Sequence, residues 1–124
     1  MNVPADLKYT KEHEWARVSG DEVTVGITDY AQGELGDIVY VELPEVGTEI
    51  AMDASFGTIE AVKAVNDLYA PLSGTVIAIN DALEDAPDKV NTDPYGDGWM
   101  IKIKLSDPAE VDKLMDSDAY AALI

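Results

Sequence analysis

Lys63 is the residue whose surroundings point most directly to chemistry. Its neighbours Ala61, Val62, Ala64 and Val65 are small or apolar, so no adjacent carboxylate neutralises the amine. A primary amine in this setting is either an ordinary solvated lysine or the point at which a prosthetic group is attached through an amide bond. Because solvated lysines are the more frequent case, the choice depends on the residues further along the chain.

Glu14 and His13 form a second place at which chemistry is conceivable. His13 is the one histidine of the chain, and the absence of cysteine excludes a thiolate nucleophile, a disulfide and a cysteine-ligated metal. A small hydrolase or transferase that uses Glu14 and His13 remains an alternative, which requires turnover by the unmodified protein. A structural role is favoured for His13, because the sequence offers no nucleophile for it to activate.

The segment Asp93–Gly98 superficially resembles a calcium-binding loop. An EF-hand loop that began at Asp93 would need an oxygen ligand at its third position and a glutamate at its twelfth. Those positions hold Tyr95 and Lys104. We therefore predict no metal site here and expect the glycines of the segment to form a turn. The chain also lacks a glycine-rich phosphate loop, a zinc motif and a nucleophile elbow.

Length and charge limit the class of protein. A chain of 124 residues with 47% hydrophobic content fits one domain. Its formal net charge of -17, from 25 acidic and 8 basic residues, repels phosphate backbones and anionic lipids, so we expect neither nucleic acid nor membrane as a partner. The N-terminal sequence has no signal-peptide pattern, and no stretch approaches the roughly 18 apolar residues of a membrane span, which favours a cytoplasmic location.

Short runs of β-branched and aromatic residues separated by turn signals predict a mainly β fold, either a sandwich or a barrel. We expect strands at Val23–Ile27, Ile38–Leu43, Ser55–Ile59, Gly74–Ile79 and Trp99–Leu105. Between the first two strands, Thr28 is a typical helix N-cap and Gly36 is a typical helix end. One short helix is therefore expected between these two residues.

The last part of the chain carries helix signals. Asp107 is a suitable N-cap and Pro108 occupies the first helical position, so Ala109–Met115 should be helical. Ser117 is expected to cap a last short helix that ends near Leu123.

The periodicity around Lys63 predicts a helix as well. Ile59, Val62, Val65 and Tyr69 recur at the spacing of one face of an amphipathic helix. No glycine or asparagine beside the lysine marks a hairpin turn.

A wider set of residues gives a different interpretation of this segment. Glu60, Lys63 and Asp67, followed by the run Tyr69–Gly74, closely resemble the lipoylation site of glycine cleavage system H proteins. The resemblance continues in the same order along most of the chain, in the segments His13–Trp15, Val25–Gln32, Leu35–Pro44 and Asp93–Lys102. Members of that family commonly carry serine where this chain has Ala61.

The resemblance implies a lipoyl/biotinyl-like β-sandwich, known as a barrel-sandwich hybrid, with short helices that include C-terminal ones. It implies that Lys63 lies at the tip of a β-hairpin and that Pro71 closes the return strand, in conflict with the helix predicted from periodicity. We expect one lipoyl-carrier domain over residues 1–124, with a lipoyl-type core at about 20–105 and a C-terminal helical segment at about 107–123.

The resemblance also implies a non-catalytic carrier whose cofactor is lipoate, bound covalently to Lys63. The implied partners are the P-protein (glycine decarboxylase), which supplies an aminomethyl group, the T-protein (aminomethyltransferase), which receives it, and the L-protein (dihydrolipoamide dehydrogenase), which reoxidises the arm. A lipoate ligase or lipoyl transferase would attach the cofactor, and Glu60 is a candidate for its recognition. Glu14 and Asp67 are candidates for the cleft that holds the loaded arm.

Three related carriers were compared with this interpretation. A biotin carrier also modifies a hairpin lysine, but that lysine usually lies between methionines, whereas Val62 and Ala64 flank Lys63 here. An H-like protein that relays lipoyl groups to other acceptors remains open, because the sequence does not separate it from a glycine cleavage carrier. A lipoyl domain of a 2-oxoacid dehydrogenase is disfavoured, because such domains usually belong to longer acyltransferase chains.

Overall fold

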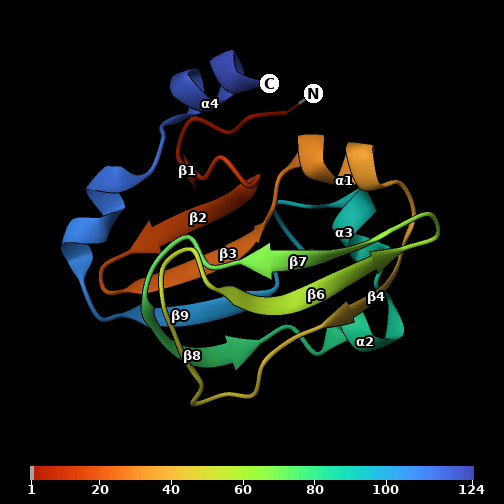
Figure 1. Ribbon diagram of the computed structural model, residues 1–124, viewed down its shortest axis with the longest axis horizontal. Coiled ribbons are helices and arrows are strands. Elements are labelled where there is room, and N and C mark those ends of the chain that lie inside the picture. Colours follow the sequence, from red (N-terminus) through yellow and green to blue (C-terminus); the bar gives the residue numbers. More distant parts are fainter. Residues whose placement is uncertain (1) are drawn as a thin grey trace.

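Two antiparallel sheets form the body of the protein in a computed structural model, which describes residues 2–124 (Figure 1). The larger sheet has the strand order β1-β2-β3-β9-β8-β5, and the smaller one has the order β4-β6-β7. The larger sheet comprises β1 (Lys8–Tyr9), β2 (Glu14–Ser19), β3 (Glu22–Ile27), β9 (Ile101–Leu105), β8 (Gly74–Ile79) and β5 (Glu49–Ile50). The smaller sheet comprises β4 (Ile38–Glu42), β6 (Ser55–Ala61) and β7 (Val65–Tyr69).

This architecture confirms the predicted mainly β sandwich, and most of its central strands were expected. The exceptions are β1, β2, β5 and β7, which the sequence pattern does not predict. Of these, β7 was expected from the family resemblance, as the return strand of the hairpin. The last predicted strand begins at Ile101 rather than at Trp99. Val25, Ile101 and Ile103 of the larger sheet are buried against Ile59 and Leu68 of the smaller one, so the main core lies between the two sheets.

Helix α1 (Asp29–Leu35) connects the two sheets and confirms the predicted short helix. The Thr28 hydroxyl accepts a hydrogen bond from the Ala31 amide at 3.2 Å, which satisfies one of the free donors of the first turn. Gly36 ends the helix at a φ of 80°, a conformation that glycine adopts without strain. Two further one-turn helices, α2 (Ala82–Asp85) and α3 (Lys89–Thr92), were not predicted.

The C-terminal helices are present, but two details differ from the prediction. The segment after Asp107 is a 3-10 helix, η1 (Pro108–Lys113), which ends before Met115. The last helix, α4 (Ser117–Leu123), is capped by Asp116 and not by Ser117. The Asp116 carboxylate accepts a hydrogen bond from the Ala119 amide at 2.8 Å. Aspartate and serine are both good N-caps, so the sequence alone does not decide between the adjacent residues Asp116 and Ser117.

A second, smaller apolar cluster lies beside the main core and joins the two ends of the chain. It consists of the buried residues Leu7, Tyr9, Trp15 and Tyr120. In Figure 1 the N-terminal segment and α4 lie next to each other at one edge of the larger sheet. Within residues 2–124, no helix is long and apolar enough to cross a membrane.

Gly26 provides a test of how tightly this second cluster is packed. It pairs with Trp15 across β2 and β3, and a Cβ atom at Gly26 would lie 2.7 Å from the indole ring. We expect Gly26→Ala to lower the free energy of unfolding by roughly 1–3 kcal/mol, because Trp15 must move from its site. Gly33→Ala is the matched control, since a Cβ there meets nothing within 4 Å. Alanine inside α1 should raise stability by up to about 1 kcal/mol, and urea denaturation measures both changes.

Candidate functional site

The segment around Lys63 is a β-hairpin, and the helix predicted from periodicity is wrong. Strands β6 and β7 pair with Glu60 opposite Val65, and the Ala61 amide donates to the Ala64 carbonyl at 2.7 Å to close the turn. Val62 and Val65 are 77% and 63% exposed, so they do not form a buried helix face. The tip of the β6–β7 hairpin protrudes at the edge of the molecule (Figure 1), and Lys63 in this tip is exposed.

The hairpin tip is tied to the connection between α1 and β4. The Val62 amide donates to the Asp37 carbonyl at 3.1 Å. The side chain of Asn91, in α3, holds the residues on either side of Asp37: it accepts from the Ile38 amide at 2.9 Å and donates to the Gly36 carbonyl at 2.8 Å. A cation at this tip is therefore carried on a support that is fixed from outside the hairpin.

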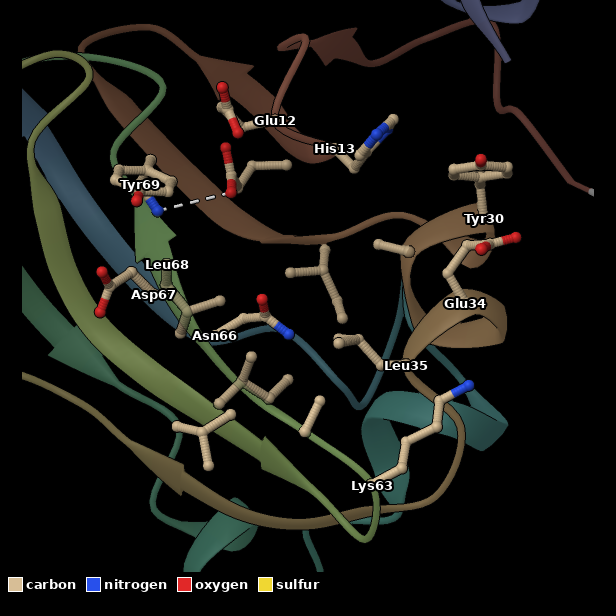
Figure 2. A pocket seen from close by; sticks show the side chains of 16 residues that line it. Glu12, His13, Tyr30, Glu34, Leu35, Lys63, Asn66, Asp67, Leu68 and Tyr69 are labelled. Atoms are coloured by element: carbon tan, nitrogen blue, oxygen red, sulfur yellow. Dashed lines mark hydrogen bonds between the residues drawn. The ribbon is translucent and has the colours of Figure 1, made fainter.

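A cleft of about 710 Å³ opens beside the hairpin (Figure 2). Its walls come from the segment before β2, from α1, and from the β6–β7 hairpin. Lys63 extends from the tip toward α1, beside Leu35 (Figure 2). Its neighbours with ionisable carboxyl groups around this cleft are Glu12, Glu14, Glu34 and Asp67. Lys63 is the one lysine or arginine among the lining residues in the part of the chain that the structure describes.

Glu14 is the most buried of these acids, with 3% of its surface exposed. The Thr10 hydroxyl donates to one carboxyl oxygen at 2.8 Å. The Tyr69 amide approaches the other at 3.4 Å (Figure 2). Burial raises the pKa of Glu14 to about 8, because the charged form loses its hydration. The two hydrogen bonds favour the ionised form, whereas the Glu12 and Asp53 carboxylates oppose it.

The buried carboxyl group predicts a specific dependence of stability on pH. Between pH 4.5 and 8, folded Glu14 keeps a proton that the unfolded chain has released. The contribution of Glu14 to the free energy of unfolding should therefore be largest below pH 4.5, shrink as the pH rises from 4.5 to 8 and be lost above 8. One pKa unit corresponds to about 1.4 kcal/mol, so the loss should amount to roughly 2–5 kcal/mol.

Denaturant unfolding of the wild type and Glu14→Gln across this range separates Glu14 from the other acids. The glutamine variant does not titrate at position 14, so the difference between the two proteins isolates that residue. Parallel stability curves for the two proteins would contradict a buried, protonated Glu14.

His13 lies next to Glu14 but points to a different partner. Its Nδ1 atom lies 2.8 Å from the Tyr120 hydroxyl, and its ring is tilted against that of Tyr30 with 4.9 Å between centroids. Burial lowers the pKa of His13, which favours the neutral imidazole. The ring is thus engaged with the C-terminal helix, which weakens the hydrolase or transferase alternative built on His13 and Glu14.

The hairpin separates the other two candidate acids. Asp67 is opposite Thr58 on the solvent face of the smaller sheet, and its side chain points away from the centre of the cleft in Figure 2. Asn66, the next residue, points its amide into the cleft. Glu60 lies on the solvent face between Tyr40 and Val65. The structure therefore brings Lys63 and Glu14 to one cleft, leaves Asp67 at its rim and places Glu60 outside.

Three residues of the cleft were not predicted from the sequence: Asn66, and the acids of the other walls, Glu12 and Glu34. Asn66 was identifiable once a strand was assumed, because side chains alternate and Leu68 on the same face is buried. Glu34 had no such signal, since its position depends on how α1 packs beside the hairpin. Within residues 2–124, no group of three or more His, Asp and Glu side chains is arranged to hold a metal ion.

Comparison with known proteins decides the family. Residues 7–124 match the family model described as Glycine cleavage H-protein. The chain belongs to the glycine cleavage H-protein family. It is 58% identical over 123 residues to the glycine cleavage system H protein of Myxococcus xanthus, covering 99% of this chain and 95% of that one. It is 56% identical over 124 residues to the H protein of Geobacillus kaustophilus, covering 100% and 98%.

A solved structure supports the same assignment. The crystal structure of an H protein from Mycobacterium marinum is 40% identical and superposes with a TM-score of 0.89, covering 97% of each chain. The resemblance on which the sequence prediction rested is therefore confirmed over nearly the whole chain. Proteins of the glycine cleavage H family are lipoyl carriers that act in glycine catabolism and one-carbon metabolism, and this chain shares that role.

Proposed function

We propose that Lys63 carries the lipoyl group and that the adjoining cleft shelters the arm together with its aminomethyl cargo. The observation that supports this best is the pairing of an exposed amine on a fixed hairpin tip with a cleft that contains a buried carboxyl group. The residues fit the cofactor: the amine is accessible to an attaching enzyme, and the cleft volume of about 710 Å³ lies within the usual range for small-molecule sites.

The cofactor and the partner enzymes supply the reactions, and the carrier itself has no catalytic role in this proposal. When bound, lipoate supplies the sulfur chemistry that accepts the aminomethyl group and is later reoxidised. The chain would meet the P-protein, which loads the arm, the T-protein, which unloads it, and the L-protein, which restores the disulfide. Membership of the glycine cleavage H family supports all three partners.

The charges of the cleft favour a cationic cargo over a neutral arm. Amide formation at Lys63 removes the one lysine charge among the described lining residues, and the carboxyl groups of Glu12, Glu14, Glu34 and Asp67 remain. An aminomethyl ammonium group would then meet a carboxyl group that has little hydration to lose, because Glu14 is already buried. A charge-assisted hydrogen bond in such a place contributes about 1.5–3 kcal/mol. Asn66 would add a neutral hydrogen-bonding group, and Asp67 would act at the rim.

The solvent face of the hairpin is suited to recognition by the attaching enzyme. Tyr40, Glu60 and Val65 form one row across β4, β6 and β7. Tyr40 and Val65 are 50% and 63% exposed, which gives an apolar surface on either side of the Glu60 carboxylate. A lipoate ligase or lipoyl transferase must approach the Lys63 amine closely, so we propose that it contacts this row.

Attachment of the cofactor should depend on Lys63 alone. Lys63→Arg keeps the positive charge but cannot form the same amide, so the variant should fold normally and gain no lipoyl mass. Intact-mass and peptide mass spectrometry after incubation with a lipoate ligase measure this. Lys89→Arg is the control and should be modified like the wild type. A lipoyl adduct on another lysine, or biotin on Lys63, would refute the assignment.

Retention of the cargo should depend on Glu14. Loss of the aminomethyl group consumes one water and releases formaldehyde and ammonia, leaving a free thiol, so exclusion of water slows it. Glu14→Gln keeps the shape of the side chain but cannot pair with an ammonium group. We expect this variant to be lipoylated normally and to lose its cargo about ten-fold faster at low salt, as a bond of this kind implies.

The decay is followed by intact mass after loading with glycine and the P-protein. Glu34→Gln is the matched control, because Glu34 lines the same cleft but is exposed. Equal half-lives for the wild type and Glu14→Gln would refute the role of Glu14.

Recognition by the ligase should depend on Glu60 and not on Glu42, an acid of the adjacent strand. Glu60→Gln should lower kcat/KM for lipoylation by roughly three- to ten-fold, the size expected for one hydrogen bond to a charged group at an interface. Glu42→Gln, on the same strand pair but further from the tip, should leave the rate unchanged. If both variants are modified at the wild-type rate, the ligase does not use the row at Glu60.

A further inference from the structure

The C-terminal helix reaches the back of the cleft through one side chain. Tyr120 of α4 is fully buried, and its ring stacks on that of Tyr9 with 4.7 Å between centroids and 7° between planes. Tyr9 is in turn paired with Met115 through two backbone hydrogen bonds of 2.8 and 2.9 Å. The position of the Tyr120 ring is therefore set by aromatic stacking and by the backbone before α4.

The hydroxyl of Tyr120 joins two walls of the cleft. It lies 2.8 Å from His13 Nδ1, and it lies 2.8 Å from Thr28 Oγ1. His13 directly precedes Glu14 in the first wall, whereas Thr28 is the N-cap of α1, which forms the second wall. These contacts span 107 and 92 residues of sequence, so a single group from the end of the chain connects both walls.

The first wall needs such support because His13 has an unfavourable backbone conformation. Its φ is 70°, in the left-handed region that costs a residue with a side chain on the order of 1–2 kcal/mol. Conformations of this kind persist where several contacts fix them. The His13 amide donates to the Thr10 carbonyl at 3.1 Å, and its carbonyl accepts from the Thr28 amide at 3.0 Å. The side chain is held by the hydrogen bond to Tyr120, and the Tyr30 ring packs against it.

The bond does not depend on the protonation state of the imidazole. When Nδ1 of neutral His13 carries no proton, it accepts a hydrogen bond from the Tyr120 hydroxyl, while Thr28 donates to the tyrosine oxygen. With a proton on Nδ1, His13 donates to that oxygen and Tyr120 donates to Thr28. The Tyr120 hydroxyl can therefore bond to both His13 and Thr28 in either arrangement. A phenylalanine at this position could bond to neither.

We infer that Tyr120 is a positioning residue of the cleft: its hydroxyl holds His13, and with it Glu14, against the start of α1. The C-terminal helix thereby sets how long the arm keeps its cargo. This inference rests on the proposed function, because it assumes that the cleft shelters the loaded arm. Tyr120 does not line the cleft, so it acts through His13 and Thr28 and not by contact with the arm.

The chain offers a matched pair of variants for the test. Tyr120→Phe and Tyr9→Phe each remove one hydroxyl from the same stacked pair and keep both rings. The Tyr9 hydroxyl donates to the Pro4 carbonyl at 2.6 Å and touches neither wall of the cleft. Both variants should lose stability, Tyr120→Phe more than Tyr9→Phe, because the Tyr120 hydroxyl makes two hydrogen bonds and the Tyr9 hydroxyl makes one. After lipoylation and loading, Tyr120→Phe should lose its cargo roughly three- to ten-fold faster, the effect expected from the lost hydrogen bond to His13, while Tyr9→Phe should match the wild type.

Two further measurements distinguish a specific effect on the position of His13 from a general loss of stability. Nitrogen NMR of the unmodified protein should show a changed Nδ1 signal for His13 in Tyr120→Phe and an unchanged one in Tyr9→Phe. In a His13→Asn variant, asparagine tolerates the left-handed backbone conformation but lacks the imidazole. Combined with Tyr120→Phe, it should give no further loss of retention, because the two residues act through one contact.

The outcomes are distinct. Wild-type retention in Tyr120→Phe, equal acceleration in both phenylalanine variants, or additive effects with His13→Asn would each overturn the inference while leaving the proposed function intact. If the wild-type arm loses its cargo as fast as aminomethylated lipoamide in free solution, the cleft does not shelter the arm. That result would overturn the proposed function and this inference together.

Discussion

The burial of Glu14 is the constraint on which the functional geometry depends. A carboxyl group with 3% exposure is costly to ionise, and the contacts that it makes are a threonine hydroxyl and a distant amide. We therefore propose that an added cation satisfies this site better than water does. The larger sheet fixes this residue by pairing Glu14 with Ile27 at the start of β2.

The β6–β7 hairpin is the second feature on which the proposed function depends. An arm that visits several enzymes needs an exposed attachment point, whereas its cargo needs shelter from water. In the proposed function the fold would meet both needs, because Lys63 lies at a protruding tip that is anchored to the Asp37 carbonyl, next to the cleft. The strong negative charge of the chain, -17, is consistent with docking against basic faces of partner enzymes.

The parts of the fold that sequence predicts are those fixed by local chemistry. The β-branched runs predict the central strands, and Thr28 and Gly36 predict α1, because capping and left-handed backbone are properties of single residues. Strand β2 was missed, since its run from Glu14 to Ser19 contains one β-branched residue and depends on pairing with β3. The division into a core at about 20–105 and a helical segment at about 107–123 stays a prediction. The larger sheet begins at Lys8, before the start of that predicted core.

The candidate site shows the same limit more sharply. The spacing of Val62 and Val65 matches one face of an amphipathic helix, which predicts that both are buried. In the hairpin both side chains are exposed to solvent, so the spacing gave a wrong prediction here. Only the family resemblance identified the hairpin. The contact between His13 and Tyr120 is invisible to local pattern, because it joins residues 107 positions apart.

The most direct test is a carbon NMR titration of the Glu14 carboxyl group in the lipoylated protein, before and after loading with the aminomethyl group. Before loading, we expect the pKa of Glu14 to lie near 8, as its burial dictates. After loading, the pKa should fall markedly, because a nearby ammonium group favours the ionised carboxylate. A Glu14 pKa that is the same in both states would contradict the claim that this carboxyl group holds the cargo.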